Sequence, residues 1–261
     1  MAPGLRSVEL SAADYGAQRF SQHWHTGFAV GVATRHAQGF HANGREWTVG
    51  AGDLIVLNPG QMHNGYALHP EGWSSRMAYI PENAFAVLAG AHLPGFALRF
   101  TDPVVASPAL AQDFLAWHCL SESAADVHGH ALTQQLFAGL AALMQPVAMD
   151  AVPESAAPAS GLRERLRAQA GQGDASVASL HAGLHLSRSG SWRRVKTELG
   201  VAPKPLLKQL RLMSAKQLLA QGCPVIEAAL DCGFHDQSHF SNQFAAAYGF
   251  TPAQFRRAQM S

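Results

Sequence analysis

The fold of the C-terminal part of this chain is decided by one stretch, Gly233-Phe-His-Asp-Gln-Ser-His-Phe-Ser-Asn-Gln-Phe-Ala-Ala-Ala-Tyr-Gly-Phe-Thr-Pro252. Asp236 suits the N-cap of a helix, because its side-chain oxygen can accept a hydrogen bond from a first-turn N–H group. A buried stripe with a spacing of four residues follows, formed by Phe240, Phe244 and Tyr248. Gly249 then ends the helix in the usual way. We therefore predict a helix that begins after Asp236 and ends at Gly249.

The same pattern occurs once more, 49 residues earlier in the chain. Residues 176–203 align with residues 225–252, so that Ser187 lies opposite Asp236 and Gly200 opposite Gly249. Each copy consists of a short apolar helix, a Gly-containing turn and a second helix with its own N-cap residue. This is the helix-turn-helix unit, whose second helix enters the major groove of DNA.

Between the two copies, residues 205–221 have the periodicity of one continuous helix. At ~1.5 Å per residue this helix is ~25 Å long. Adjacent major-groove segments on one side of DNA lie ~34 Å apart. One rigid helix of this length can place the two units on successive segments of the groove.

The net charge of the chain differs between the part before the two helix-turn-helix copies and the part that contains them. Residues 1–159 contain six Arg, no Lys and twelve acids, which gives a net charge of −6, whereas residues 160–261 carry +7. This asymmetry is typical of a nucleic-acid-binding half joined to a half with another task.

The N-terminal part has short apolar segments between residues 15 and 80, separated by Gly, Asn and Pro. Asn43-Gly44 is a strong hairpin turn, since both residues tolerate a positive φ. Such a pattern predicts a β-sandwich or barrel. Residues 109–121 and 131–144 then predict an αα-hairpin that packs either on the barrel or on a second subunit.

The C-terminal part resembles the AraC/XylS-type family of transcription regulators over roughly residues 175–258. The residues that carry this resemblance are Arg211-Leu212, Ala215, Leu218-Leu219, Ala228-Ala229, Gly233-Phe234, Asp236 to Phe240, Phe244, Tyr248-Gly249, Thr251-Pro252 and Phe255-Arg256. The N-terminal part resembles the cupin-type sensor domain of that family, through His23-Trp-His25 and the run Gly52 to His63.

Together these resemblances imply an α+β protein of two domains. A cupin-like β-barrel with an αα-hairpin, for effector binding and dimerisation, would occupy residues 1–148. A linker would follow at residues 149–161. An all-α DNA-binding domain with two helix-turn-helix units would occupy residues 162–261.

The family pattern implies base contacts from the exposed side of each second helix. In the first unit these are Ser189, Trp192 and Arg193, and in the second they are Gln237, Ser238, His239 and Asn242. Arg can bind guanine through two hydrogen bonds, and Gln or Asn can read adenine. Each position is equally open to a phosphate contact or to plain exposure on the helix surface. The sequence departs from the family at Gly190, which weakens the first helix by ~1 kcal/mol relative to Ala, and at Asn242, where an arginine is common.

In the N-terminal domain the expected effector site comprises His23, His25, Phe28, His63 and Arg76. Imidazoles of this kind also suit Zn, Fe, Ni or Cu. The acid that usually follows the His-x-His pair in cupins is missing, because residues 26–30 contain no Asp or Glu. We therefore expect no metal and no cofactor, and the three histidines can equally be structural.

The leading hypothesis is an effector-responsive regulator of transcription with no catalytic residues. Its partners would be double-stranded promoter DNA, a small-molecule effector, RNA polymerase and a second copy of the chain. An effector acts only if it binds two states of the protein with different affinity. One alternative is a cupin-type metal-dependent enzyme with an accessory DNA-binding domain. Another is a DNA-binding protein whose N-terminal half only dimerises.

The expected location is the cytoplasm. Cys119, Cys223 and Cys232 are too few and too scattered for a disulfide framework or a metal motif, which fits reduced thiols. The N-terminus lacks the pattern of a secretory signal, and no apolar run is long enough to span a membrane.

Overall fold

A computed structural model describes residues 5–90, 96–122, 126–148, 187, 190 and 202–259. The chain divides into two compact units. The N-terminal unit is Met1–Arg19 with Trp24–Val152, and the C-terminal unit is Phe20–His23 with Pro153–Ser261.

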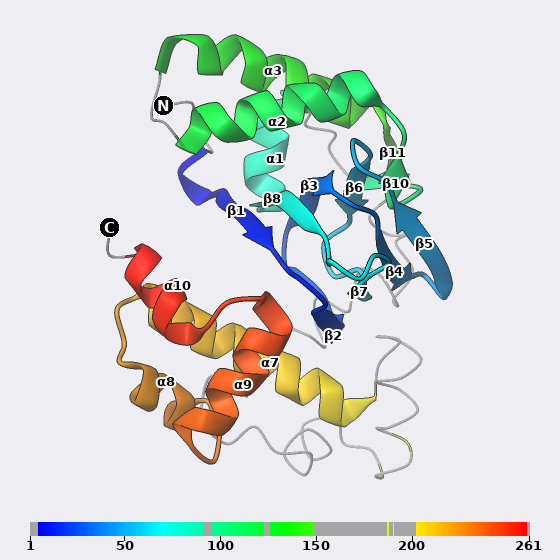
Figure 1. The fold of residues 1–261 in the computed structure, drawn as a ribbon. Helices are drawn as coiled ribbons and strands as arrows, with labels where there is room; N and C mark the ends of the chain where they lie inside the picture. Colours follow the sequence, from blue (N-terminus) through cyan, green and yellow to red (C-terminus); the bar gives the residue numbers. More distant parts are fainter. Residues whose placement is uncertain are drawn as a thin grey trace. The chain divides into compact units, whose positions relative to one another are not determined.

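A five-stranded antiparallel sheet forms the centre of the N-terminal unit (Figure 1). Its strands, in spatial order, are β1 (Glu9–Asp14), β8 (Ser74–Ile80), β3 (Phe28–Arg35), β6 (Leu54–Leu57) and β10 (Val104–Val105). In the middle of the sheet, Val30 pairs with Ala78 on one side and with Val56 on the other. The central strands β3 and β6 are largely apolar, because side chains on both of their faces are buried.

A second sheet has four strands, in the order β2 (Arg19–His23), β7 (His63–Ala67), β4 (Gln38–Ala42) and β5 (Arg45–Val49). Strands β4 and β5 form a hairpin in which Ala42 pairs with Arg45. Asn43 and Gly44 form the turn between them, with φ angles of 53° and 73°. The hairpin that Asn43-Gly44 predicts is therefore confirmed.

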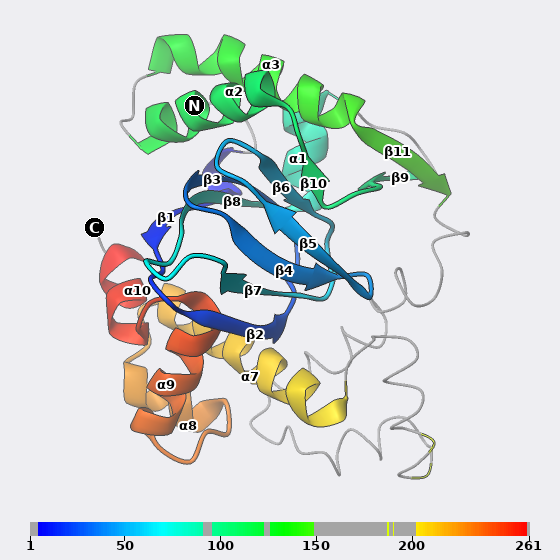
Figure 2. The same cartoon turned by 45° about the vertical axis from the view of Figure 1, so that its right-hand side comes forward.

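The prediction of a cupin-like β-barrel needs a correction, because the two sheets are not closed into a barrel (Figure 2). Apart from one isolated bridge between Ala33 and Ala51, no strand pairing in the described residues joins them. They are held together instead by apolar side chains, with Phe40 and Val49 of one sheet in the same buried cluster as Leu57 of the other. Burial of these side chains does not require the continuous ladder of hydrogen bonds that a closed barrel has.

Three helices cover the other face of the five-stranded sheet (Figure 1), namely α1 (Glu82–Ala89), α2 (Pro108–Glu122) and α3 (Asp126–Ala142). Phe114, Trp117 and Leu136 of α2 and α3 are buried against strand residues that include Val30. The predicted αα-hairpin is confirmed, and it packs on the sheet. Helix α3 begins five residues earlier than its periodicity indicated.

Several small elements of this unit were not predicted from the sequence. A 3-10 turn, Leu5–Ser7, precedes β1, and helix α1 follows β8. Strands β9 (Phe96–Phe100) and β11 (Met144–Ala148) pair into a separate two-stranded ribbon.

Apart from Phe20–His23, which belong to strand β2, the C-terminal unit is helical where it is described. Its elements are α7 (Pro203–Ala220), α8 (Val225–Asp231), α9 (Gln237–Tyr248) and α10 (Pro252–Gln259). One core cluster joins them, in which Leu212 and Leu219 of α7 are buried with Phe240 and Phe244 of α9 and Phe255 of α10. The predicted continuous helix is confirmed as α7, and the predicted second helix-turn-helix unit is confirmed as α8 and α9.

Candidate nucleic-acid interface and sensor site

Helix α9 has the two ends that its sequence predicts. The Asp236 side chain accepts a hydrogen bond from the backbone N–H of His239 at 2.7 Å. At the other end Gly249 is in the left-handed region, with φ 83°, and its N–H donates to the Ala245 carbonyl at 2.8 Å. The N-cap at Asp236 therefore sets the start of the helix, and the left-handed Gly249 sets its end.

The turn before α9 is tight and leads the chain sharply from α8. Gly233 adopts φ 73°, which a residue with a side chain rarely adopts, and the Phe234 N–H donates to the Ala229 carbonyl at 3.0 Å. Phe234 is buried and its ring lies 4.9 Å from that of Phe240. The aromatic side chain thus anchors α9 on α8 and leaves the opposite side of α9 exposed.

Four residues of α9 predicted to contact bases are exposed on that helix, and these are Gln237, Ser238, His239 and Asn242. They present amide, hydroxyl and imidazole groups, which can donate to or accept from base edges. The structure therefore brings the four candidates of the second unit together on one helix.

In the first helix-turn-helix unit the structure describes only two residues. Gly190 is helical, and its backbone N–H donates to the Ser187 hydroxyl at 3.1 Å. This is the contact that Asp236 makes with the N–H of His239, displaced by 49 residues. The candidate contacts Ser189, Trp192 and Arg193 lie outside the described residues.

In the N-terminal half, the structure brings the three predicted histidines together. His23, His25 and His63 each offer a ligand atom, and these atoms lie within 4.8 Å of one another. Nδ1 of His23 lies 2.8 Å from the Ser21 carbonyl, and Nδ1 of His63 lies 2.9 Å from the Gln61 carbonyl. A carbonyl only accepts, so Nδ1 carries a proton in both rings.

Burial favours the neutral form of His23. His23 and His63 are 6% and 5% exposed. Loss of hydration lowers the pKa of His23, and its hydrogen bond to Ser21 opposes this shift only in part. His25 lies between the rings of His63, at 5.1 Å, and Tyr79, at 4.6 Å. Three imidazoles in this arrangement can bind a polar ligand or a transition metal.

The other two residues expected at the effector site lie elsewhere. Side chains alternate along β3 and β8, and Phe28 shares the buried cluster of the helix-covered face with Phe85 and Phe100. Arg76 also points to this face, where its guanidinium donates to Nδ1 of His118 at 3.0 Å. The structure therefore separates Phe28 and Arg76 from the three histidines.

A second group of potential metal ligands was missed in the sequence. It consists of His36, His69 and Glu71, whose ligand atoms lie within 4.8 Å of one another near the surface. The rings of His36 and His69 are stacked, with centroids 3.9 Å apart and planes at 7°. The lone pairs of an imidazole lie in the plane of its ring. In two stacked rings they lie in parallel planes and do not meet at one point, so a shared metal would require one ring to rotate. No local motif signals this group, because 33 residues separate the two histidines.

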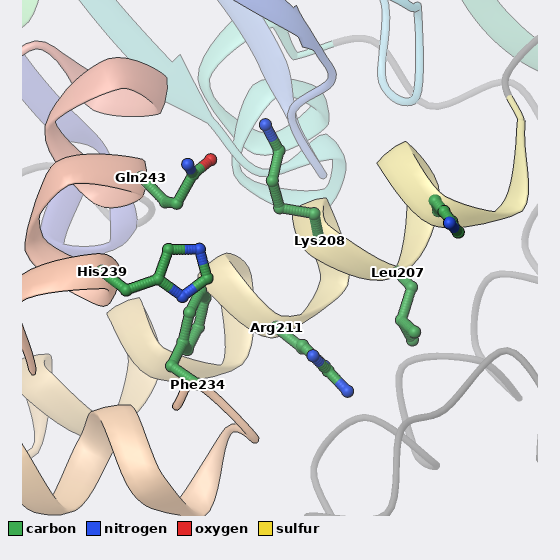
Figure 3. A pocket seen from close by; sticks show the side chains of 7 residues that line it. Leu207, Lys208, Arg211, Phe234, His239 and Gln243 are labelled. Carbon is green, nitrogen blue, oxygen red and sulfur yellow. The ribbon is translucent and has the colours of Figure 1, made fainter. Parts of the chain in front are cut away.

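A hollow of about 410 Å³ lies in the C-terminal unit (Figure 3). It is lined by α7, the turn before α9, and α9 itself, through Lys204, Leu207, Lys208, Arg211, Phe234, His239 and Gln243. Its cations occupy positions i, i+4 and i+7 of α7, which share one side of a helix. This spacing is visible in the sequence and could have indicated a basic stripe.

Comparison with known proteins assigns a class to this fold and these sites. Residues 7–182 match the model of the AraC-like ligand binding domain, and residues 180–258 match a helix-turn-helix domain. The chain is a transcription regulator with a ligand-binding and a DNA-binding domain. It belongs to the AraC family.

Individual relatives agree with this assignment. The transcriptional activator RhaR of Klebsiella pneumoniae is 28% identical, over 98% of this chain and 94% of its own length. The activator RhaS of Escherichia coli is 37% identical over 68 residues, which are 26% of this chain and 24% of RhaS.

Solved structures of ToxT from Vibrio cholerae share the two-domain fold. An apo form has a TM-score of 0.61 at 14% identity, with 96% of each chain covered. A form bound to an unsaturated fatty acid has a TM-score of 0.60 at 14% identity, with 98% of this chain and 97% of ToxT covered.

Within the described part of the chain, no helix is both long and apolar enough to cross a membrane.

Proposed function

We propose that α9 reads the base edges of promoter DNA through Gln237, Ser238, His239 and Asn242. The first unit does the same through Ser189, Trp192 and Arg193. A small-molecule effector bound at His23, His25 and His63 alters the affinity for DNA. The observation that carries the proposal is the exposed polar side of α9, on a helix whose start and end are both fixed.

The histidine group supports the effector part of the proposal. A neutral imidazole offers one donor and one acceptor, and Tyr79 beside His25 offers an aromatic face. An effector with polar groups and a flat apolar part would satisfy both. The fatty acid in the ToxT structure is an organic ligand of a protein with the same fold. In this proposal Phe28 and Arg76 do not contact the effector, and their role is to pack the helices on the sheet.

The remaining parts of the proposal concern partners and place of action. The protein acts by binding, with no catalytic step of its own. It activates transcription through contact with RNA polymerase, and the outer surface of α2 and α3 forms a homodimer. These events take place in the cytoplasm, where the promoter DNA is.

The DNA-reading part is tested by selection of bound sequences from a random DNA library at fixed salt. Wild type should enrich a two-part motif. Gln237→Ala should relax one part of it, with a loss of about 1–3 kcal/mol of base discrimination, whereas Gln259→Ala on α10 should leave the motif unchanged. Binding without any enriched motif would contradict the proposal.

The effector part is tested by a thermal-shift screen of small metabolites on the full chain. A true effector should raise the melting temperature, change the affinity for the selected DNA, and lose both effects in His25→Phe. A ligand that stabilises the protein and leaves DNA affinity unchanged would refute its role as an effector.

One observation favours a second function, that of a metal-dependent enzyme. Three histidines with converging ligand atoms suit a transition metal, and their Nδ1 hydrogen bonds resemble those of metal-bound imidazoles. Metal analysis of the purified protein separates the two readings. Stoichiometric metal together with turnover of a small substrate would support the enzyme.

A further inference from the structure

The basic side of α7 and the exposed side of α9 meet at the hollow. Lys204 is exposed and Lys208 is half-buried, and both line the hollow. Figure 3 labels Lys208 on α7. His239 and Gln243 of α9 border the same hollow from the other side (Figure 3). His239 therefore belongs both to the DNA-reading side of α9 and to the rim of the hollow.

The charges at the hollow all have one sign. Its lining contains Lys204, Lys208 and Arg211 and, among the residues that the structure describes, no acid. In the described part of the chain, neither lysine forms a salt bridge. Within the described ranges, therefore, no acid neutralises these two ammonium groups beside α9.

The dimensions of DNA indicate what these cations meet. A helix with its side chains is ~10–12 Å across, and the major groove is ~12 Å wide. A helix that fills the groove therefore has a sugar-phosphate strand along each side. Lys204 and Lys208 line the hollow together with His239 and Gln243, whereas Ser238 and Asn242 do not line it. Cations beside the reading surface of a helix reach the backbone rather than the bases.

We propose that Lys204 and Lys208 bind backbone phosphates of the DNA strand beside α9, so that α7 is a DNA-binding element as well as the connection between the two helix-turn-helix units. This inference rests on the DNA-binding function and extends it to a helix outside either helix-turn-helix unit. Arg211 has a different task. Its guanidinium lies against Gly233, where an added Cβ would come within 3.3 Å of it, and so it supports the turn before α9.

The salt dependence of DNA binding tests this proposal. Each phosphate contact contributes about 0.9 to the slope of log Kobs against log salt concentration. Lys204→Gln and Lys208→Gln should each reduce the slope by about 0.9, and the double variant by about 1.8. Each lost contact makes the fall in affinity between about 50 and 200 mM salt about 3.5-fold smaller. Affinity for selected and for random DNA should decline by the same factor.

Lys216→Gln is the matched control, because it removes the same charge from the same helix. The Lys216 ammonium lies 5.0 Å from the centre of the Tyr248 ring and 5.1 Å from that of Phe255, away from the hollow. It should leave the slope unchanged, which excludes a general effect of net charge. Thermal melting of every variant confirms that it is folded before its slope is compared.

Three outcomes would overturn the proposal. The first is an unchanged slope in the double variant while wild type still binds its selected motif. The second is an equal reduction in Lys216→Gln. The third is a hollow that binds free inorganic phosphate, seen as a stabilisation lost in Lys208→Gln, with no change in slope. If wild type itself selects no motif, the DNA-reading function fails instead, and the slopes still report on the lysines through non-specific binding.

Discussion

Arg76 and His118 join the central sheet to the helices of the N-terminal unit. The guanidinium on β8 donates to Nδ1 of His118 on α2 at 3.0 Å, and Nε2–H of the same ring donates to the Met77 carbonyl at 3.2 Å. His118 is completely buried. A charged strand residue is thus held on the helix side of the sheet by one buried ring that uses both of its nitrogens.

His118→Leu should destabilise the protein by about 1–3 kcal/mol, because it leaves buried polar groups without this partner. Arg76→Ala should be destabilising too, with the response to effector retained. Arg45→Ala, in the exposed hairpin of β4 and β5, is the control and should change stability by less than about 0.5 kcal/mol. Chemical denaturation measures all three variants. If Arg76→Ala abolished the effector response at unchanged stability, Arg76 would be a ligand contact.

Asp236→Ala should cost about 1 kcal/mol of stability in the C-terminal unit, since the His239 N–H loses its acceptor. Asp236→Ser supplies another acceptor and should restore most of the loss. Both are measured by urea unfolding, followed through the helical circular dichroism signal. Equal destabilisation by the two substitutions would show that the cap is not the cause.

Stability should decline as the pH falls below about 6.5. The pKa of His23 is lowered in the folded protein, so in that range the unfolded chain binds a proton that the folded chain does not. Stability therefore rises with pH wherever the unfolded state holds more protons, and it is lost on acidification. The free energy of unfolding at pH 7.5 and at pH 5.5 should differ less in His23→Gln than in wild type. An identical difference in both would exclude His23 as the source.

The three cysteines should react with iodoacetamide in a fixed order. Cys119 is exposed, whereas Cys232 is buried and burial raises its pKa to about 11. At pH 8 only roughly a thousandth of such a thiol is ionised, and the thiolate is the reactive form. Mass spectrometry of partly labelled protein should find Cys119 modified first and Cys232 last. In urea, where the protein is unfolded, all three cysteines should react alike. Early labelling of Cys232 in the native protein would contradict the structure.

The C-terminal unit was predictable because its signals are local. An N-cap at Asp236, a stripe through Phe240 and Phe244 and a stop at Gly249 all lie within one short segment. The basic side of α7 was equally visible in the spacing of Lys204 and Lys208, although its place beside α9 depends on tertiary packing.

The N-terminal unit was predictable only in part. Asn43-Gly44 indicated its hairpin, but pairing such as that of Glu9 with Tyr79 joins residues 70 positions apart, and no local signal encodes it. For the same reason, whether the sheets close into a barrel could not be read from the strands. The three histidines were expected together and are together. Phe28 and Arg76 went to the opposite face, because the face of a strand residue is set by the register of the whole sheet.

The alternation along β8 makes this sensor suitable for redesign. Met77 and Tyr79 point toward the second sheet and the histidines, whereas Arg76 and Ala78 point toward the helices. A mutant library confined to Met77, Tyr79 and the neighbouring position Ala29 would vary the surroundings of the three histidines without disturbing the helix-bearing face. A biosensor for a new compound could therefore be evolved from this scaffold at alternate residues of two strands.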